Sequence, residues 1–185
     1  MKNDNKGFSL VEMVVIVGIL GIIISIGARN MGLINTYNTR QCKDKMQSAI
    51  ESVKMDCLTK SRTNLTTTSK ADTYMEIVYK NNQVYARTYL PKKTDGKPEL
   101  VTEELISKGN RTKLKIKMMS PGSYSATPLE TYMTDGETMR IAFNRSTGAI
   151  LPDDGYGGKM LGGFVIEEGK SKREITIQTM TGKIN

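Results

Sequence analysis

The stretch that decides the fold is Lys6-Gly7-Phe8-Ser9-Leu10-Val11-Glu12 together with the apolar run that follows it to Ala28. Within that run only Ser25 is polar, and Glu12 is the one charged residue between Phe8 and Ala28. A helix needs about 20 apolar residues to cross about 30 Å of hydrocarbon. Residues 8–28 meet that length, so the sequence predicts a helix that can span a bilayer.

An ordinary secretory signal is the competing explanation of this run. Such signals join a basic segment to an apolar segment and end at a small-residue cleavage site, and Ser25-Ile26-Gly27 could serve as that site. Glu12 argues against it, because a charged side chain inside a spanning helix costs a few kcal/mol and usually marks a function. The sequence therefore favours an anchor helix with a functional carboxylate.

Gly7-Phe8-Ser9-Leu10-Val11-Glu12 resembles the class III signal of type IV pilins and pseudopilins, over roughly residues 6–28. The resemblance implies cleavage between Gly7 and Phe8 by a prepilin peptidase, followed by N-methylation of Phe8. It also implies that Glu12 assists assembly by pairing with the N-terminal amine of a neighbouring subunit. That pairing is physically reasonable, because leaving one buried charge without its partner is strongly unfavourable.

The apolar run departs from the family pattern in one respect. Many pilins carry a proline within this helix or near its far end, whereas the first proline here is Pro91. Only Gly18, Gly21 and Gly27 weaken the run, each by about 1 kcal/mol relative to alanine. The resemblance therefore does not carry over the local unwinding that the family shows in filaments.

Charge around the apolar run sets the expected topology. Lys2 and Lys6 precede the run, and positive residues favour the cytoplasmic side. We expect a single-pass protein in the cell membrane, with a cytoplasmic N-terminus and an external C-terminal domain that joins an extracellular or cell-envelope filament. The expected divisions are a leader at residues 1–7, a transmembrane helix at 8–28, an amphipathic helix at 29–60 and an antiparallel β domain at 61–185.

The segment after the run has helical periodicity. Met46, Ala49, Ile50, Val53 and Cys57 share one face at a period of 3.6 residues, and Met31, Ile34 and Cys42 extend the same helix toward the membrane, less regularly. A continuous helix places Cys42 and Cys57 about 22 Å apart, which is beyond the reach of a disulfide. Both cysteines are therefore expected to be free thiols packed as small hydrophobic side chains.

From Tyr74 onward the apolar period becomes two residues, which is typical of strands. The expected strands are residues 74–80, 83–90, 113–118, 139–143, 164–166 and 174–178, while residues 100–106 fit either a strand or a helical turn. Asn81-Asn82 and residues 168–171 are expected hairpin turns. Residues 61–73 and 120–134 are expected loops, and residues 151–163 an irregular segment.

One long helix followed by about seven short strands predicts an α+β fold with the helix packed on a mostly antiparallel sheet, as in pilins. A second, weaker resemblance concerns the end of the chain. Residues 141–148 and 173–182 resemble the end of minor pseudopilins of type II secretion and of related minor pilins. It implies a minor subunit rather than an abundant one.

The strand at residues 113–118 alternates lysines with apolar side chains, and the chain as a whole has a net charge of +8. This alternation predicts that Leu114, Ile116 and Met118 point inward. Together with two preceding cations, the lysines form a candidate DNA contact: Lys108, Arg111, Lys113, Lys115 and Lys117. The alternative is a solvated face that protects an edge strand from aggregation, and no interleaved aromatic residue is present to stack bases.

Catalytic and metal-binding patterns are weak. The chain contains no histidine, the commonest general base and a common zinc ligand. Asp153 and Asp154, with Asp135 and Glu137, could offer oxygens to calcium, but the spacing does not fit an EF-hand loop. We expect no cofactor, no metal and no enzymatic activity.

The expected function is that of a structural subunit of a type IV pilus or of a secretion or competence pseudopilus. Its expected partners are the prepilin peptidase, other pilin or pseudopilin subunits and the inner (cytoplasmic) membrane. The alternatives are a minor pilin that binds DNA for uptake and a secreted protein with a removable signal.

Overall fold

The computed structural model describes residues 9–62, 66–107, 111–121 and 127–185. The chain divides into two units, Met1–Ile34 and Asn35–Asn185. One helix, α1 (Leu10–Lys60), belongs to both. The N-terminal unit is described by this helix, in which an 18-residue window is apolar enough to cross a membrane and has no buried residue.

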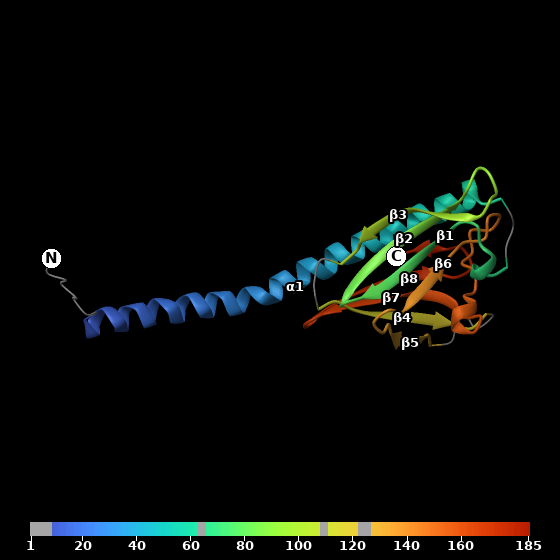
Figure 1. Ribbon diagram of the computed structural model, residues 1–185. Coiled ribbons are helices and arrows are strands. Elements are labelled where there is room, and N and C mark those ends of the chain that lie inside the picture. The colour runs from blue at the N-terminus through green and yellow to red at the C-terminus, as the bar shows by residue number, and fades with distance from the viewer. Residues whose placement is uncertain (1–8, 63–65, 108–110, 122–126) are drawn as a thin grey trace, which may run out of the picture. The chain divides into compact units, whose positions relative to one another are not determined.

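The C-terminal unit combines residues 35–60 of α1 with two antiparallel sheets (Figure 1). The first sheet has the order β3-β2-β1-β6, and the second has the order β5-β4-β7-β8-β9. The bounds of the strands are β1 Tyr74–Lys80, β2 Gln83–Pro91, β3 Pro98–Leu105, β4 Lys113–Met119, β5 Leu129–Tyr132, β6 Thr138–Ile141, β7 Met160–Glu168, β8 Ser171–Gln178 and β9 Lys183–Ile184. Two short 3₁₀ helices complete the unit, η1 (Thr68–Lys70) and η2 (Asp154–Tyr156). The predicted α+β class with a long helix on antiparallel strands is confirmed.

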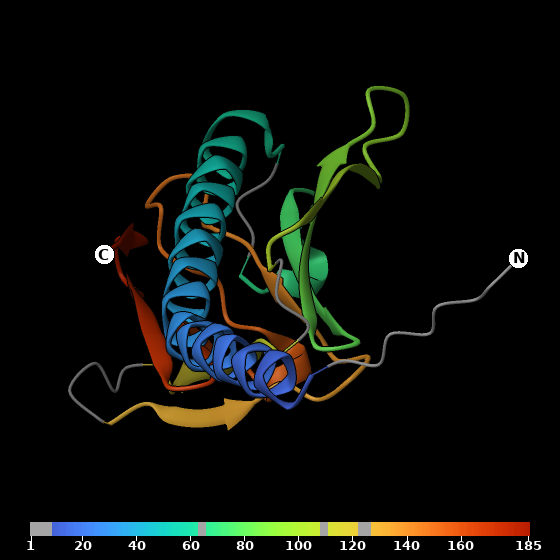
Figure 2. The same ribbon diagram turned by 90° about the vertical axis from the view of Figure 1, so that its left-hand side faces the viewer.

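The periodic face of α1 forms the centre of one hydrophobic core. Its buried members are Cys42, Met46, Ile50, Val53 and Cys57, and they cluster with inward side chains of both sheets. Figure 2 shows β2 and β3 on one side of this part of α1 and β8 on the other. Both cysteines are buried free thiols, as predicted.

The predicted continuation of this helix toward the membrane is confirmed, because α1 runs without a break from Leu10 to Lys60. The Ile34 side chain is 57% exposed. Ile34 is the last residue of the N-terminal unit. The side chain of Met31 lies outside the described residues.

Both predicted hairpin turns are present. Asn81 and Asn82 have φ values of 53° and 58°, which is the geometry that a two-residue turn between right-twisted strands requires. Gly169 has a φ of 60° in the turn that joins β7 to β8. These turns fix the β1–β2 and β7–β8 registers, which pair Lys80 with Gln83 and Glu168 with Ser171.

Two sequence-based expectations need correction, and one open alternative is decided. Residues 120–134 are not all loop, because residues 129–132 form the edge strand β5 on β4. Residues 151–163 contain η2 and the start of β7, although their glycines suggested an irregular segment. Of the two alternatives for residues 100–106, the strand is confirmed, because residues 100–105 of β3 pair with residues 85–89 of β2.

Candidate assembly motif and outer-face site

The start of α1 is closed by a reciprocal pair of hydrogen bonds. The Glu12 carboxylate accepts from the Ser9 backbone N–H at 2.8 Å, and the Ser9 hydroxyl accepts from the Glu12 backbone N–H at 3.2 Å. This is a capping box, in which two side chains satisfy backbone donors that the first helical turn leaves without partners. The sequence Ser9-Leu10-Val11-Glu12 therefore both begins the helix and fixes the position of its one carboxylate.

Glu12 keeps one oxygen available for a further partner. Its Oε2 atom accepts the bond from Ser9, whereas Oε1 has no hydrogen bond among the described residues. The other polar side chain of the apolar run, Ser25, donates to the Ile22 carbonyl oxygen at 2.8 Å and so needs no external partner. Gly7 and Phe8, the predicted cleavage and methylation residues, lie outside the described residues.

No residue that the structure describes covers the apolar part of α1. Its side chains from Leu10 to Ile26 are exposed, including every large hydrophobic one described. A Cβ added to Gly18, Gly21 or Gly27 would meet no atom within 4 Å. A surface of this kind is unstable in water and needs lipid or other helices to cover it.

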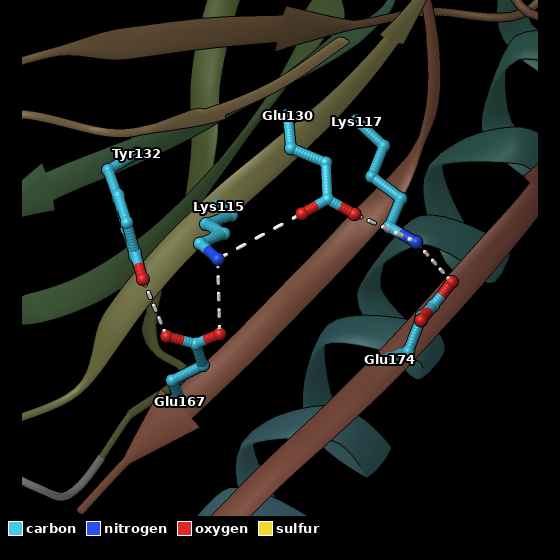
Figure 3. Close-up of polar contacts among 6 residues, drawn as sticks. All are labelled: Lys115, Lys117, Glu130, Tyr132, Glu167 and Glu174. Atoms are coloured by element: carbon cyan, nitrogen blue, oxygen red, sulfur yellow. Dashed lines mark hydrogen bonds and ion pairs between the residues drawn. The ribbon is translucent and has the colours of Figure 1, made fainter. Parts of the chain in front are cut away.

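A second site lies on the outer face of the five-stranded sheet. Lys115 and Lys117 alternate along β4 and point away from the core, as predicted, while Leu114, Ile116 and Met118 are buried. Figure 3 shows the two lysines among residues from β5, β7 and β8: Glu130, Tyr132, Glu167 and Glu174. Cross-strand neighbours on one face are the usual source of such contacts.

The lysines of this outer face form one connected network. Lys117 donates to Glu174 at 2.5 Å and lies 3.3 Å from Glu130. Lys115 lies 3.4 Å from Glu167 and 3.9 Å from Glu130, and its ammonium is 4.5 Å from the centre of the Tyr132 ring. Glu130 therefore bridges the two lysines (Figure 3).

These contacts shift the pKa values in the direction that ion pairs produce. The pKa of Glu174 is lowered chiefly by its hydrogen bond from Lys117. Burial raises the pKa of Glu167, but hydrogen bonds from Tyr132 and Lys115 outweigh it and the net shift is downward. Burial lowers the pKa of Lys117, yet its bonds to Glu174 and Glu130 raise the net value.

The five cations proposed as a DNA contact thus occupy different surroundings. Lys115 and Lys117 are engaged with carboxylates on the outer face. Arg111 and Lys113 are exposed and have no ion pair within the described parts of the chain. Lys108 lies outside the described residues.

The acidic residues considered for calcium have other partners. Asp153 accepts hydrogen bonds from the Thr68 hydroxyl and from the N–H groups of Gly155 and Arg140. Glu137 accepts from Thr134 and from the Tyr156 hydroxyl. Across the residues that the structure describes, no group of three or more potential ligands converges on one point.

The acidic half of the outer-face network was not recognised from the sequence. Glu130 and Tyr132 lie two residues apart on β5, opposite Lys117 and Lys115. The two side chains that face the lysines are thus spaced as in a strand. The segment is only four residues long, is exposed and follows Pro128, so its sequence did not indicate a strand. Glu174 belongs to an expected strand and Glu167 lies one residue beyond another, but their closeness to the lysines of β4 depends on the order of the sheet.

Comparison with known proteins identifies only the N-terminal segment. Residues 2–28 match the family described as the prokaryotic N-terminal methylation motif. No curated protein and no solved structure matches the chain. The matched segment contains the Gly7–Phe8 bond, Ser9, Glu12 and the whole apolar run. The chain therefore carries the methylation motif of type IV pilin-like precursors at residues 2–28 and is pilin-like in this segment.

Proposed function

We propose that the protein is a prepilin-like structural subunit, cleaved after Gly7, methylated on Phe8 and assembled into a type IV pilus or a secretion or competence pseudopilus. The observation that carries this proposal is the uncovered apolar helix that follows the methylation motif. Lipid can cover this helix in the precursor, and equivalent helices of neighbouring subunits can cover it in a filament. The C-terminal sheets then form the outer surface.

Glu12 has the assembly role in this proposal. Its Oε1 atom is available, whereas its Oε2 atom holds the first helical turn through Ser9. A neighbouring N-terminal amine would supply the positive charge that makes burial of this carboxylate tolerable, since a lone buried charge is far more costly than a paired one. The amine exists only after the leader is removed, so cleavage and assembly are linked.

The test is replacement of Glu12 by leucine in cells that build the filament. We expect the variant to remain in the membrane, because leucine is apolar, and to be absent from sheared or secreted filaments. Ser25→Leu is the matched control, since it removes the other polar side chain of the run without touching the carboxylate. Normal incorporation of Glu12→Leu would refute the assembly role.

A minor rather than abundant subunit, oriented with the N-terminus in the cytoplasm, is the finer form of the proposal. Lys2 and Lys6 support this orientation. In this role the chain is a substrate of the prepilin peptidase and has no catalytic activity of its own. Cysteine labelling at an introduced external site in intact cells would test the orientation.

A further inference from the structure

Five exposed cations gather at one end of the C-terminal unit. Arg111 lies just before β4, Lys113 is the first residue of β4, and Lys170, Lys172 and Arg173 belong to the β7–β8 hairpin. None of the five has an ion pair within the described residues, in contrast to Lys115 and Lys117 farther along β4. We call this group the basic end.

The sheet register brings the two segments together. Lys113 lies opposite Glu167 of β7, which in turn lies opposite Lys172 of β8. A shallow pocket of about 380 Å³ opens between them and is lined by Asn82, Arg111, Lys113, Glu167 and Gly169. Lys113 and Lys172 therefore flank Glu167 across the sheet, and Arg111 lies beside them at the pocket.

The carboxylates near this surface are engaged elsewhere. Glu167 accepts a hydrogen bond from the Tyr132 hydroxyl at 2.8 Å and pairs with Lys115. Glu168 is buried and accepts from the Asn38 side chain at 3.1 Å. Asp135 accepts from the backbone N–H of Asn81. The basic end is thus a region of net positive charge.

The hairpin packs on the first residues of the C-terminal unit. The hydroxyls of Thr39 and Ser171 are 2.8 Å apart, and a Cβ added to Gly169 would lie 2.5 Å from the Asn35 side-chain amide. Residues 29–34 separate Asn35 from Ala28, where the apolar run ends, and a helix covers that stretch in about 10 Å. The basic end is therefore attached to the chain close to its apolar segment.

We propose that the basic end binds the anionic phosphate headgroups of the membrane that holds residues 8–28, and so anchors the unassembled subunit at the bilayer surface. The inference rests on the proposed function, because it requires the apolar run to lie in a membrane. Cations close to an anionic bilayer each strengthen binding by about fivefold. The attraction decays over about 8 Å at physiological salt, so closeness to the apolar run favours lipid over a free polyanion.

The experiment measures the rate at which an amine-reactive reagent labels individual lysines. The full-length chain is reconstituted in bilayers of neutral phosphatidylcholine or of phosphatidylcholine mixed with anionic phosphatidylglycerol, and labelling is read by peptide mass spectrometry. Lys113, Lys170 and Lys172 report on the basic end. Lys93 and Lys97 are internal controls. Their turn follows β2 at Pro91, and β2 separates it by about 26 Å from Gln83, the residue of β2 that lies nearest the basic end.

We expect labelling of the three reporter lysines to be about fivefold slower in anionic bilayers at low salt, and to recover as salt is raised. Lys93 and Lys97 should label equally in both bilayers. Equal rates for the reporters in both lipids, or equal slowing at Lys93 and Lys97, would overturn the proposal. Protection by added duplex DNA but not by anionic lipid would assign the surface to nucleic acid instead.

Charge reversal supplies the matched variants. Lys170→Glu with Lys172→Glu and Arg173→Glu should abolish the lipid-dependent protection of Lys113, whereas Lys93→Glu with Lys97→Glu should retain it. Retained backbone amide protection in the buried strands shows that the variants are folded. Extraction of the bilayers with alkali distinguishes failure of this inference from failure of the proposed function. If the chain stays in the bilayer but its reporter lysines are not protected, only the binding of the basic end to lipid is refuted. If alkali removes the chain, the membrane anchoring by residues 8–28 is refuted as well.

Discussion

Ser9 and Glu12 bond to each other in both directions at the first turn of α1, with the carboxylate on the Ser9 N–H and the hydroxyl on the Glu12 N–H. The bonds are 2.8 Å and 3.2 Å long. The same carboxylate that assembly would use is therefore already part of the helix start. Its position is set before any partner arrives.

Replacement of Ser9 by alanine should loosen this start. Loss of an N-cap hydroxyl costs about 1 kcal/mol, so backbone amides of the first turn should exchange hydrogen about fivefold faster in a bilayer mimetic. Ser9→Thr is the control, because it keeps the hydroxyl and should exchange like the natural chain. Unchanged exchange in Ser9→Ala would show that the capping box does not stabilise the helix start.

Replacement of Lys117 by methionine should destabilise the C-terminal unit. Its side chain is only 15% exposed and contacts both Glu130 and Glu174, so the free energy of unfolding should fall by about 1 kcal/mol, the upper range for partly exposed pairs. Chemical denaturation measures this change. The Arg40–Asp44 pair has both side chains mostly exposed, and Arg40→Gln should change stability by less than about 0.5 kcal/mol.

The same network predicts sensitivity to acid. The pKa values of Glu167 and Glu174 are lowered in the folded chain, so the folded state binds fewer protons than the unfolded state. Their stabilisation is complete above the unfolded glutamate pKa of about 4.3 and is lost as pH falls through the folded values. The free energy of unfolding should decline below about pH 5, and less steeply in the Glu174→Gln variant. An identical pH dependence in that variant would contradict the assignment.

Both cysteines should resist alkylation in the folded chain. Burial raises the pKa of Cys42 to about 12 and that of Cys57 to about 11, and the thiolate is the reactive form. Iodoacetamide at pH 8 should modify neither residue until denaturant is added, as read by intact mass. Rapid modification of both thiols without denaturant would show that this part of α1 is not packed in the core.

Local patterns in the sequence were sufficient for the helix and for the hairpins. The period of Met46, Ile50 and Val53 predicted the core face of α1, and Asn81-Asn82 predicted a turn whose positive φ values the structure shows. Each of these features depends on residues that are neighbours along the chain. Their geometry follows from backbone and side-chain properties within a few residues.

Features that depend on strand order were not predictable in this way. Alternation indicates which side chains point inward but not which strands pair, so the division into two sheets and the β1–β6 pairing were not foreseen. The partners of Lys117 come from β5 and β8 for the same reason. Residues 120–134 predict loop because they contain Pro121, Gly122 and Pro128, and the four-residue edge strand β5 among them is exposed throughout.

Proteolytic processing at Gly7–Phe8 is the central claim, and the intact mass of the N-terminal peptide from the cell-made protein tests it most directly. We predict a mature chain that begins with Phe8 and carries one added methyl group, and a Gly7→Leu variant that retains residues 1–7. An N-terminus near Ala28 would identify a removable secretory signal. That result, or an unprocessed natural chain in cells with an active prepilin peptidase, would contradict the account.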